Sequence, residues 1–331
     1  MKHSMNDILA LVRSGRLQDA TDAIQQGLRG DEAMPDAPMK DVTPRPRALS
    51  GPQEDIAARG KPANNGGWSR RDGPLSVRLY TPSAPVADAP LIVMLHGCTQ
   101  TPEDFALGTR MNAAAEVIGA HVIWPEQARS ANPNGCWNWF EPGHQGRTGE
   151  AAAIAAAVRA IAAEVAPMAS GIHVAGLSAG GAMAAILGTR YPEIFASVGV
   201  HSGLPVGSAQ DVMSAFAAMR SGGIAGSAMP VPLIVFHGSA DRTVAPANGA
   251  ALAGAGPQGS KPRRRTTRIG GRDATVTRTE TPEGRPASEF WQVDGLGHAW
   301  SGGDGAGSFA DPQGPDATAE MLRFFAEVDR R

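Results

Sequence analysis

Ser178 is the residue whose surroundings most clearly favour chemistry. It lies in the run GLSAG at 176–180, between a short apolar stretch and a segment with helical periodicity. A G-x-S-x-G run that joins a strand to a helix is typical of a nucleophile elbow, a sharp turn that exposes the serine hydroxyl. The N–H groups at the start of such a helix also attract developing negative charge. We therefore predict that Ser178 is a nucleophile, and the alternative is a glycine-rich turn without chemistry.

His298 is the predicted general base, because a serine hydroxyl is a weak nucleophile until a base accepts its proton. In folds that carry such an elbow, the order along the chain is serine, acid, histidine. His298 lies in the loop GLGHAWSGG at 295–303, after an apolar strand pattern and after an acid-bearing strand end. His201 is too close to the elbow, and His237 precedes the best acid. The alternative for His298 is a hydrogen-bonded loop histidine.

Asp241 is the predicted acid of the same group. It follows a buried strand pattern directly, in the run FHGSAD at 236–241. Its carboxylate would orient the histidine ring and stabilise the charged form of that ring. Three other aspartates precede the histidine and fit less well, namely Asp211 in a polar helical stretch, Asp273 in a hairpin and Asp294 in a turn. The alternative for Asp241 is a turn residue or a helix cap.

Two backbone N–H groups are predicted to bind the negative oxygen of a tetrahedral intermediate. One belongs to Ala179, the residue after the candidate nucleophile. The other belongs to Cys98, in the loop HGC at 96–98 after the first long buried strand. Gly97 lets the backbone turn there. Loss of one such donor costs about 3–4 kcal/mol of transition-state stabilisation.

These residues need a scaffold that brings the ends of several strands together, and the sequence predicts one. Short apolar runs alternate with segments of helical periodicity, which favours an α/β fold, a mostly parallel sheet with helices on both faces. Predicted strands cover 75–80, 91–95, 121–124, 172–175, 197–200, 233–236 and 289–293, and predicted helices cover 150–165, 179–191 and 316–331. Ligands of such sheets bind at the carboxyl ends of the strands, where the candidate residues lie.

Three regions follow from the composition along the chain. Residues 1–30 are predicted to form a helical hairpin, a short N-terminal helical arm, and residues 31–70, rich in Pro, Gly, Asp and Arg, a linker. Residues 71–331 are the predicted catalytic domain. The expected role of the arm is packing or pairing two copies as a homodimer, and the alternative is a regulatory or polymer-contacting role. Residues 1–28 lack the features of a secretory signal, so a cytoplasmic location is the default expectation.

Composition and charge exclude several classes of protein. Lys and Arg number 30 and Asp and Glu 32, a net charge of −2, whereas nucleic-acid binders usually carry a strong basic excess. No apolar run approaches the roughly 18 residues that span a membrane. His96 and His237 lack a third ligand at sensible spacing, so we expect no metal and no cofactor. The basic run KPRRR at 261–265 is interpreted as a solvated loop.

The assembled motifs resemble the poly(3-hydroxybutyrate) depolymerase family of esterases, in the α/β-hydrolase superfamily. The matching stretches are LHGCTQTPEDFA (95–106), CWNWFEPGHQGRTGE (136–150), VAGLSAGGAMAAIL (174–187), VGVHSGLP (198–205), VFHGSAD (235–241) and GLGHAWSGG (295–303). The resemblance implies Ser178 as nucleophile, Asp241 as acid and His298 as base, with Cys98 and Ala179 as oxyanion donors.

The resemblance also implies an ester substrate, typically a short-chain polyhydroxyalkanoate or its oligomers. Related feruloyl and acetylxylan esterases share much of the pattern, so a carbohydrate ester is the alternative. We expect the chain to lack both the signal peptide and the carboxy-terminal substrate-binding domain of secreted polymer-degrading members. We therefore expect it to act on soluble oligomers, amorphous polymer or small esters rather than on crystalline polymer.

The two cysteines, Cys98 and Cys136, each follow a core strand on the catalytic side, and the resemblance favours a disulfide between them. The closed loop of 38 positions would contribute roughly 4 kcal/mol in the chain-entropy model. Disulfides are rare in the cytosol. This pairing therefore allows an extracellular location in spite of the missing signal.

Three tryptophans, Trp137, Trp139 and Trp300, are predicted to bind substrate. The first two lie in one glycine-flanked segment, and Trp300 lies two residues after the candidate base. Exposed aromatic rings there would form an apolar cleft for a neutral polyester chain. The alternative is that the rings pack into the domain.

Overall fold

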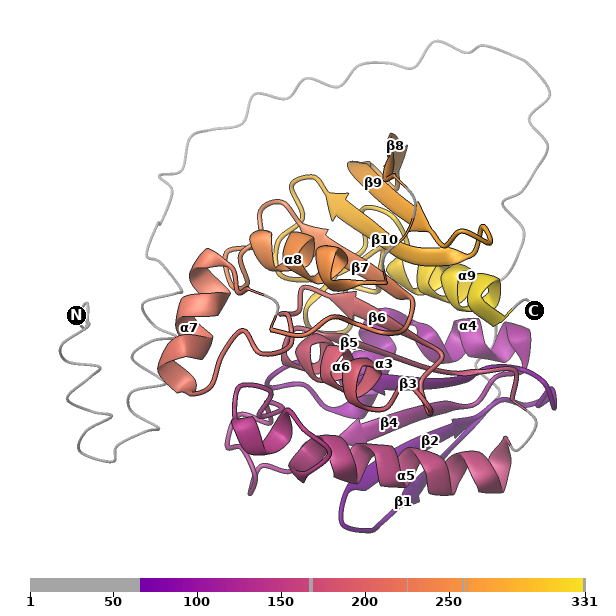
Figure 1. Ribbon diagram of the computed structural model, residues 1–331. Coiled ribbons are helices and arrows are strands. Elements are labelled where there is room, and N and C mark those ends of the chain that lie inside the picture. The colour runs from indigo at the N-terminus through magenta and orange to yellow at the C-terminus, as the bar shows by residue number, and fades with distance from the viewer. Residues whose placement is uncertain (1–65, 167–168, 225, 258, 260, 330–331) are drawn as a thin grey trace, which may run out of the picture. The chain divides into compact units, whose positions relative to one another are not determined.

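The computed structural model describes residues 66–166, 169–224, 226–257, 259 and 261–329 (Figure 1). The hairpin predicted at residues 1–30 lies outside the described residues, as does most of the linker predicted at 31–70. The pairing of two copies through that hairpin lies outside them too. None of the described helices is both long and apolar enough to cross a bilayer.

One ten-stranded sheet forms the centre of the described part. Its strands are β1 (Gly67–Arg71), β2 (Ser76–Thr81), β3 (Leu91–Leu95), β4 (Val122–Glu126), β5 (Ile172–Leu177), β6 (Ser197–His201), β7 (Leu233–Gly238), β8 (Arg263–Ile269), β9 (Arg272–Glu280) and β10 (Pro286–Val293). They lie side by side in the order β1-β2-β4-β3-β5-β6-β7-β10-β9-β8. From β4 to β10 in this order neighbours are parallel, and the outer strands are antiparallel. A separate two-stranded sheet pairs β11 (Trp300–Ser301) with β12 (Ala310–Asp311).

The parallel strands are buried on both faces, because their side chains alternate between two cores. In β3, Leu91, Val93 and Leu95 pack into one cluster. Ile92 and Met94 of the same strand pack into the other. A strand in this position therefore has a continuous apolar run in the sequence rather than an alternating one.

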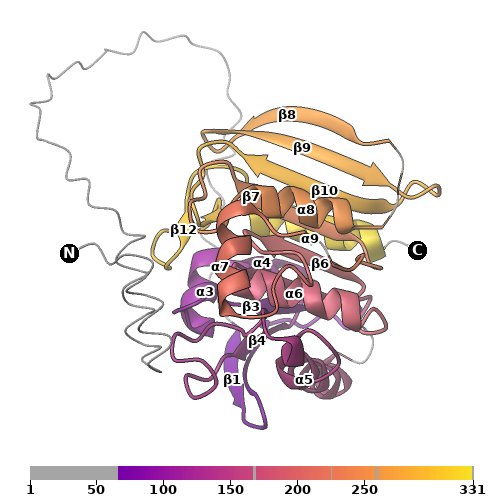
Figure 2. The ribbon, with the colours of Figure 1, turned by 60° about the vertical axis from the view of Figure 1, so that its left-hand side comes forward.

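Helices cover both faces of the sheet (Figures 1 and 2). Buried side chains of the first cluster come from α5 (Gly149–Val165), α6 (Ala179–Arg190), α7 (Val212–Ser221) and α8 (Ala247–Ala255). Those of the second come from α3 (Pro102–Thr109), α4 (Met111–Ile118) and α9 (Ala317–Asp329). A short 3-10 helix, η1 (Pro142–His144), precedes α5. Helices on both faces of a mostly parallel sheet are what the sequence predicts.

The register of the sheet aligns the strand ends that carry the candidate residues. Leu177 at the end of β5 lies opposite His201 at the end of β6. The final residues of β7 and β10 are likewise paired. The loops that begin after these strands therefore leave the same edge of the sheet.

Two segments that the sequence predicts to be irregular contribute strands to the edges of the sheet. The linker predicted at 31–70 extends too far, because Gly67–Arg71 pairs with β2 as strand β1. The basic run at 261–265, interpreted as a solvated loop, enters β8, whose backbone pairs with β9. Most residues of both strands are exposed, so neither strand shows the apolar alternation typical of a half-buried strand. The sheet therefore begins before the boundary predicted at residue 71.

Candidate active site

Ser178 lies on a tight turn between β5 and α6. Its backbone has φ +58° and ψ −120°, a conformation that costs free energy for a residue other than glycine. Gly180 has no room for a side chain, because a Cβ there would lie 2.1 Å from the Leu95 carbonyl oxygen. The Ser178 N–H donates to the His201 carbonyl oxygen at 2.9 Å. The neighbouring backbone therefore fixes this serine at the edge of the sheet.

Asp241 and His298 are joined by a hydrogen bond. The His298 Nδ1 lies 2.7 Å from Asp241 Oδ2. The other carboxylate oxygen accepts the N–H groups of Thr243 and Val244, each at 2.9 Å. Because the carboxylate is fixed by three donors, it holds the imidazole with the proton on Nδ1 and leaves Nε2 able to accept another.

His237 is a second imidazole beside the Asp241 carboxylate, and the sequence pattern predicts no catalytic role for it. Its Nε2 lies 2.8 Å from the Val244 carbonyl oxygen and 3.5 Å from Asp241 Oδ2. Burial by itself would raise the pKa of Asp241, but hydrogen bonds from His237 and His298 and the charge of His298 hold that pKa well below its ordinary value. The carboxyl group is therefore ionised at neutral pH.

His201 links the serine turn to the loop of the candidate base. Its Nε2 accepts the Ser301 N–H at 3.0 Å, and its carbonyl oxygen accepts the Ser178 N–H. Burial of the ring lowers the pKa of His201 well below its ordinary value, so the ring is neutral and Nε2 can accept. Among the described residues no hydrogen bond joins the Ser178 hydroxyl to His298. Such bonds often tighten only when a substrate binds.

The backbone N–H groups of Cys98 and Ala179 donate to no acceptor in the described part of the chain. Cys98 follows β3 and Ala179 begins α6, next to the serine turn. The neighbouring Gly97 N–H is already bound to Gln100 Oε1 at 2.9 Å. Among the described residues, neither candidate oxyanion donor is therefore engaged in a hydrogen bond.

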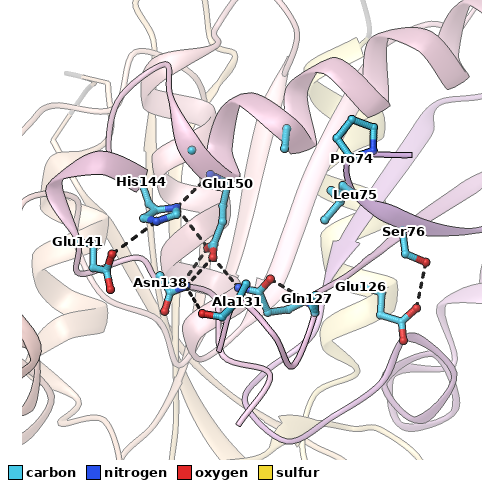
Figure 3. Close-up of a pocket in the computed structure, with 13 residues that line it drawn as sticks. Pro74, Leu75, Ser76, Glu126, Gln127, Ala131, Asn138, Glu141, His144 and Glu150 are labelled. Atoms are coloured by element: carbon cyan, nitrogen blue, oxygen red, sulfur yellow. Dashed lines mark hydrogen bonds and ion pairs between the residues drawn. The ribbon is translucent and has the colours of Figure 1, made fainter. Parts of the chain in front are cut away.

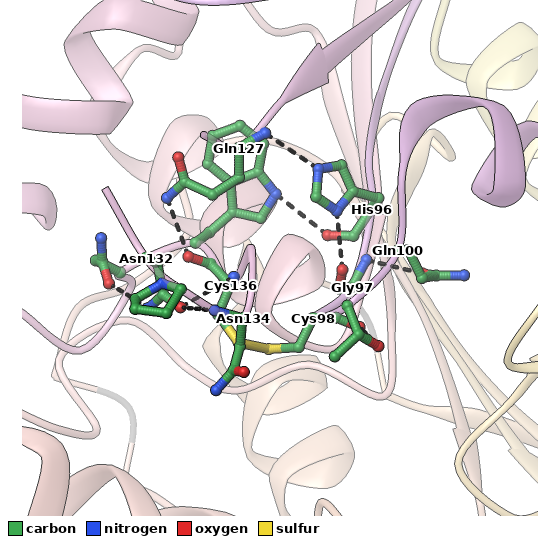
Figure 4. The surroundings of a disulfide bond; sticks show 12 residues. His96, Gly97, Cys98, Gln100, Gln127, Asn132, Asn134 and Cys136 are labelled. Carbon is green, nitrogen blue, oxygen red and sulfur yellow. Dashed lines mark hydrogen bonds between the residues drawn. A yellow bond between two sulfur atoms is a disulfide. The ribbon is translucent and has the colours of Figure 1, made fainter. Parts of the chain in front are cut away.

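The disulfide between Cys98 and Cys136, which the resemblance implies, is present (Figure 4). It joins the candidate oxyanion loop to the segment after β4. Next to it, the Thr99 N–H donates to the Asn134 carbonyl oxygen at 2.7 Å. One covalent bond and one backbone hydrogen bond therefore hold the loop against that segment.

Glu150 also holds the segment after β4, through Asn138. It lies beside a pocket of about 430 Å³ (Figure 3). Its carboxylate accepts a hydrogen bond from the Gln127 side chain at 2.6 Å. It also accepts the backbone and side-chain N–H groups of Asn138, at 2.7 and 2.6 Å. A buried carboxylate is tolerated because it is bonded in this way. The candidate catalytic residues do not line this pocket.

The three tryptophans predicted to bind substrate are buried, which corrects the expectation of an exposed aromatic cleft. Trp137, Trp139 and Trp300 expose 0%, 6% and 1% of their surface. Trp137 donates its indole N–H to the His96 carbonyl oxygen, and Trp300 donates its own to the Thr318 hydroxyl. Burial of a large aromatic ring stabilises the folded state strongly, provided that the polar atom of the ring has a hydrogen-bond partner. They support the backbone near the site and offer little surface to a substrate.

Gln100 and Glu150 are two buried residues of the site that the sequence reasoning missed. Both lie inside stretches that carry the family resemblance, and a polar residue within such a stretch is the signal that could have identified them. Within the described ranges, no group of three or more His, Cys, Asp or Glu side chains could hold a metal ion.

Known proteins resemble this chain over its central part. A family model described as Esterase PHB depolymerase matches residues 75–280. The poly(3-hydroxyalkanoate) depolymerase C of Paucimonas lemoignei is 37% identical over 192 residues, which cover 53% of this chain and 46% of that protein. The feruloyl esterase B of Neurospora crassa is 32% identical over 135 residues, which cover 40% of this chain and 45% of that protein. The chain spans about half the length of these curated relatives.

A solved structure shares the fold. The acetyl xylan esterase from Aspergillus awamori matches with a TM-score of 0.60 and 18% identity, covering 79% of this chain and 100% of that one. At this identity the likeness shows the fold alone. Together with the strand order and the helices on both faces, it confirms the predicted α/β-hydrolase fold.

Proposed function

The chain belongs to the Esterase PHB depolymerase family, and on this premise we propose that it is a serine esterase that forms an acyl-enzyme on Ser178. The observation that carries the proposal is the 2.7 Å hydrogen bond between His298 Nδ1 and Asp241 Oδ2. Both residues follow strands that end at the edge where Ser178 lies. An oriented imidazole of this kind is the base that a serine nucleophile needs.

In the proposed acylation step, Ser178 Oγ attacks the ester carbonyl carbon while His298 Nε2 accepts the hydroxyl proton. The carbonyl π electrons move to the oxygen, and the N–H groups of Cys98 and Ala179 stabilise the resulting oxyanion. When this intermediate collapses, the bond to the alcohol oxygen breaks and His298 gives its proton to the leaving alkoxide. Asp241 stays ionised and stabilises the imidazolium.

In the proposed deacylation step, water attacks the acyl carbon and His298 Nε2 accepts one of its protons. The second intermediate collapses, Ser178 Oγ leaves, and the same proton returns to it. One ester and one water become one carboxylic acid and one alcohol. The balance requires water as the co-substrate.

The proposed substrate is a short-chain polyhydroxyalkanoate, such as poly(3-hydroxybutyrate), or its oligomers. Support comes from the 37% identity with the Paucimonas lemoignei depolymerase. A feruloylated or acetylated carbohydrate ester is the second candidate, because a feruloyl esterase is also among the relatives, at 32% identity.

Product release by the wild type and by Ser178→Ala tests both the mechanism and the substrate. Amorphous poly(3-hydroxybutyrate), hydroxybutyrate oligomers, feruloylated and acetylated sugars and a simple aryl ester form the panel. We expect monomer or dimer from the hydroxybutyrate substrates, and no turnover by Ser178→Ala. Ser221→Ala, which changes an exposed serine at the end of α7, is the control.

Turnover near the wild-type rate in Ser178→Ala would contradict the mechanism. If the wild type cleaves the aryl ester and ignores both hydroxybutyrate substrates, the serine mechanism stands and the polyester assignment falls. The carbohydrate esters would then take its place.

A further inference from the structure

Phe309 is an exposed aromatic side chain beside the candidate base. It exposes 45% of its surface. Its ring centroid lies 6.3 Å from the centroid of the His298 ring, and the two planes make an angle of 78°. An edge-to-face arrangement at this distance is favourable for rings. A molecule that reaches His298 therefore meets an apolar surface next to it.

The backbone of Phe309 is held in a left-handed conformation, with φ +50°. A bulky residue rarely adopts such a conformation unless the surrounding structure fixes it, and functional sites are common places for it. Here the Trp300 N–H donates to the Phe309 carbonyl oxygen at 2.7 Å, next to the pairing of β11 with β12. Phe309 is thereby attached to the residues that directly follow the candidate base.

Ser308 anchors the same loop to α3. Its N–H donates to Asp104 Oδ1 at 2.9 Å, and its carbonyl oxygen accepts Gln100 Nε2 at 3.0 Å. The other end of the Gln100 amide accepts the Gly97 N–H in the candidate oxyanion loop. One buried side chain therefore connects the loop of Phe309 to the loop that carries an oxyanion donor.

Leu107 is a further exposed apolar residue, on α3 next to Gly108, which meets this loop. It exposes 49% of its surface, and a Cβ on the next residue, Gly108, would lie 3.5 Å from the Ser308 carbonyl oxygen. Single exposed apolar side chains are ordinary on protein surfaces. Contact with the imidazole and the constrained backbone distinguish Phe309 from such cases.

We propose that Phe309 contacts the substrate and binds the alcohol portion of the ester, an inference that rests on the ester hydrolysis proposed above. His298 must give its proton to the leaving alkoxide, so the alcohol oxygen passes within hydrogen-bond reach of the imidazole. Groups attached to that oxygen then lie beside the ring of Phe309. The preferred substrates are esters whose alcohol carries an apolar branch at the carbon next to the ester oxygen.

Hydroxybutyrate esters match this description better than sugar esters do. In a 3-hydroxybutyrate chain, the alcohol carbon bears a methyl group. In a sugar ester, the alcohol carbon is surrounded by hydroxyl-bearing carbons. An apolar ring without a polar atom fits the first arrangement better.

The test varies the alcohol while the acyl group stays constant, and then the reverse. Butyrate esters of methanol, isopropanol and benzyl alcohol form the first series, and isopropyl acetate beside isopropyl butyrate forms the second. We expect Phe309→Ala to lower kcat/KM about tenfold for the isopropyl and benzyl esters and to leave methyl butyrate within about twofold. Phe309→Leu should restore most of the loss. The acetate-to-butyrate ratio should stay unchanged, because the acyl portion does not contact this ring.

Val117→Ala is the matched control, since Val117 is a 75% exposed apolar residue on α4. It should change none of these values. An equal loss for every alcohol would show that Phe309 only supports the loop, and no loss would show that it does not contact the substrate, so either result overturns the proposal. A wild type that cleaves no ester would overturn the proposed function as well. A wild type that cleaves esters without an alcohol-dependent effect of Phe309 would overturn this inference alone.

Discussion

The histidines around the candidate site differ in what their ring nitrogens bind. His96 and His201 each accept a backbone N–H at Nε2, and His237 approaches a backbone carbonyl oxygen with its Nε2. His298 is the one of these four whose Nδ1 approaches a carboxylate. Its Nε2 makes no hydrogen bond within the described residues. This difference in hydrogen bonding, rather than residue type, makes His298 the candidate base.

Replacing Asp241 with Asn should slow ester turnover strongly. The Asn oxygen would accept the N–H groups of Thr243 and Val244, so its NH2 group would face His298 Nδ1. That contact favours the imidazole with its proton on Nε2, which cannot accept a proton from Ser178. In serine proteases the corresponding change lowers kcat about 10⁴-fold, and we expect a loss of that order in kcat on an aryl ester.

Asp294→Asn is the matched control for this change. Asp294 is an exposed aspartate near His298, and its carboxylate accepts the Ser239 hydroxyl at 2.9 Å. Its replacement should leave kcat within about twofold, because it does not contact the imidazole. A kcat near the wild-type value in Asp241→Asn would contradict the role of Asp241 as the acid.

The buried imidazole of His201 should make the protein less stable in mild acid. Its pKa is well below the ordinary 6.5 because the ring is buried, so the unfolded chain takes up a proton that the folded chain excludes. This contribution to stability is complete above about pH 6.5 and is lost as the pH falls, by up to about 1.4 kcal/mol per pH unit. Urea unfolding between about pH 8 and pH 5 measures the effect.

His201→Gln keeps a hydrogen-bond acceptor and cannot take up a proton in this range. The variant should be less stable than the wild type at neutral pH, and its stability should fall less steeply toward pH 5. Asp241 does not interfere, because its pKa is lowered from 3.8 and its titration lies at more acidic pH. Equal slopes for the wild type and the variant would contradict this account.

At the scale of elements, the loop after β3 is positioned by another segment, residues 132–138. The disulfide and the Thr99–Asn134 hydrogen bond hold it there. Glu150, at the start of α5, binds Asn138 and so holds the segment itself. The position of a candidate oxyanion donor therefore depends on contacts among β3, the segment after β4 and α5.

Removing the disulfide with Cys98→Ser and Cys136→Ser should lower both stability and turnover. The chain-entropy model gives a stability loss of about 4 kcal/mol for a loop of this length. A displacement of the Cys98 N–H by about 1 Å would lower kcat on the order of 10²-fold. Urea unfolding and kcat on an aryl ester measure the two effects.

Dithiothreitol treatment provides the control for this double variant. It should reproduce both losses in the wild type and have no effect on the double variant. If the double variant is less stable yet turns over at the wild-type rate, the disulfide stabilises the fold without positioning the oxyanion donor.

At the scale of the described domain, both edges of the large sheet are rich in arginine. β8 consists of RRRTTRI and β1 of GWSRR, and most residues of both are exposed. The unpaired edge of a sheet offers hydrogen-bonding groups to another chain, and charged side chains oppose such pairing. We therefore expect the arginines of β8 to oppose pairing of this edge with another chain.

Replacing Arg263 and Arg264 with Val should make the protein associate. Valine favours strands, and the change removes two positive charges from the edge. Light scattering at increasing protein concentration should show a rising mean mass, while the free energy of unfolding changes by no more than about 0.5 kcal/mol per substitution. The same double change to Lys keeps the charge and should remain as dispersed as the wild type. Association of the Lys variant would show that charge is not the protecting feature.

Local sequence patterns predict the fold class, the order of the central elements along the chain and the residues of the candidate triad, and the structure confirms the first two. Predicted strands at 91–95, 172–175 and 233–236 are present because strands buried on both faces need continuous apolar runs. The turn at Ser178 is recognisable because close backbone contacts leave space only for glycine beside it. These signals are local, so they can be detected within a few neighbouring residues.

The exposure of individual side chains and the contacts that hold the site depend on tertiary packing. Trp137 and Trp300 enter the cores, whereas Phe309 stays exposed beside His298. Nothing in the neighbouring sequence distinguishes these rings, because burial depends on elements that lie far away along the chain. Edge strands such as β1 and β8 escape prediction for the same reason, since backbone pairing with a partner strand, rather than apolar side chains, defines them.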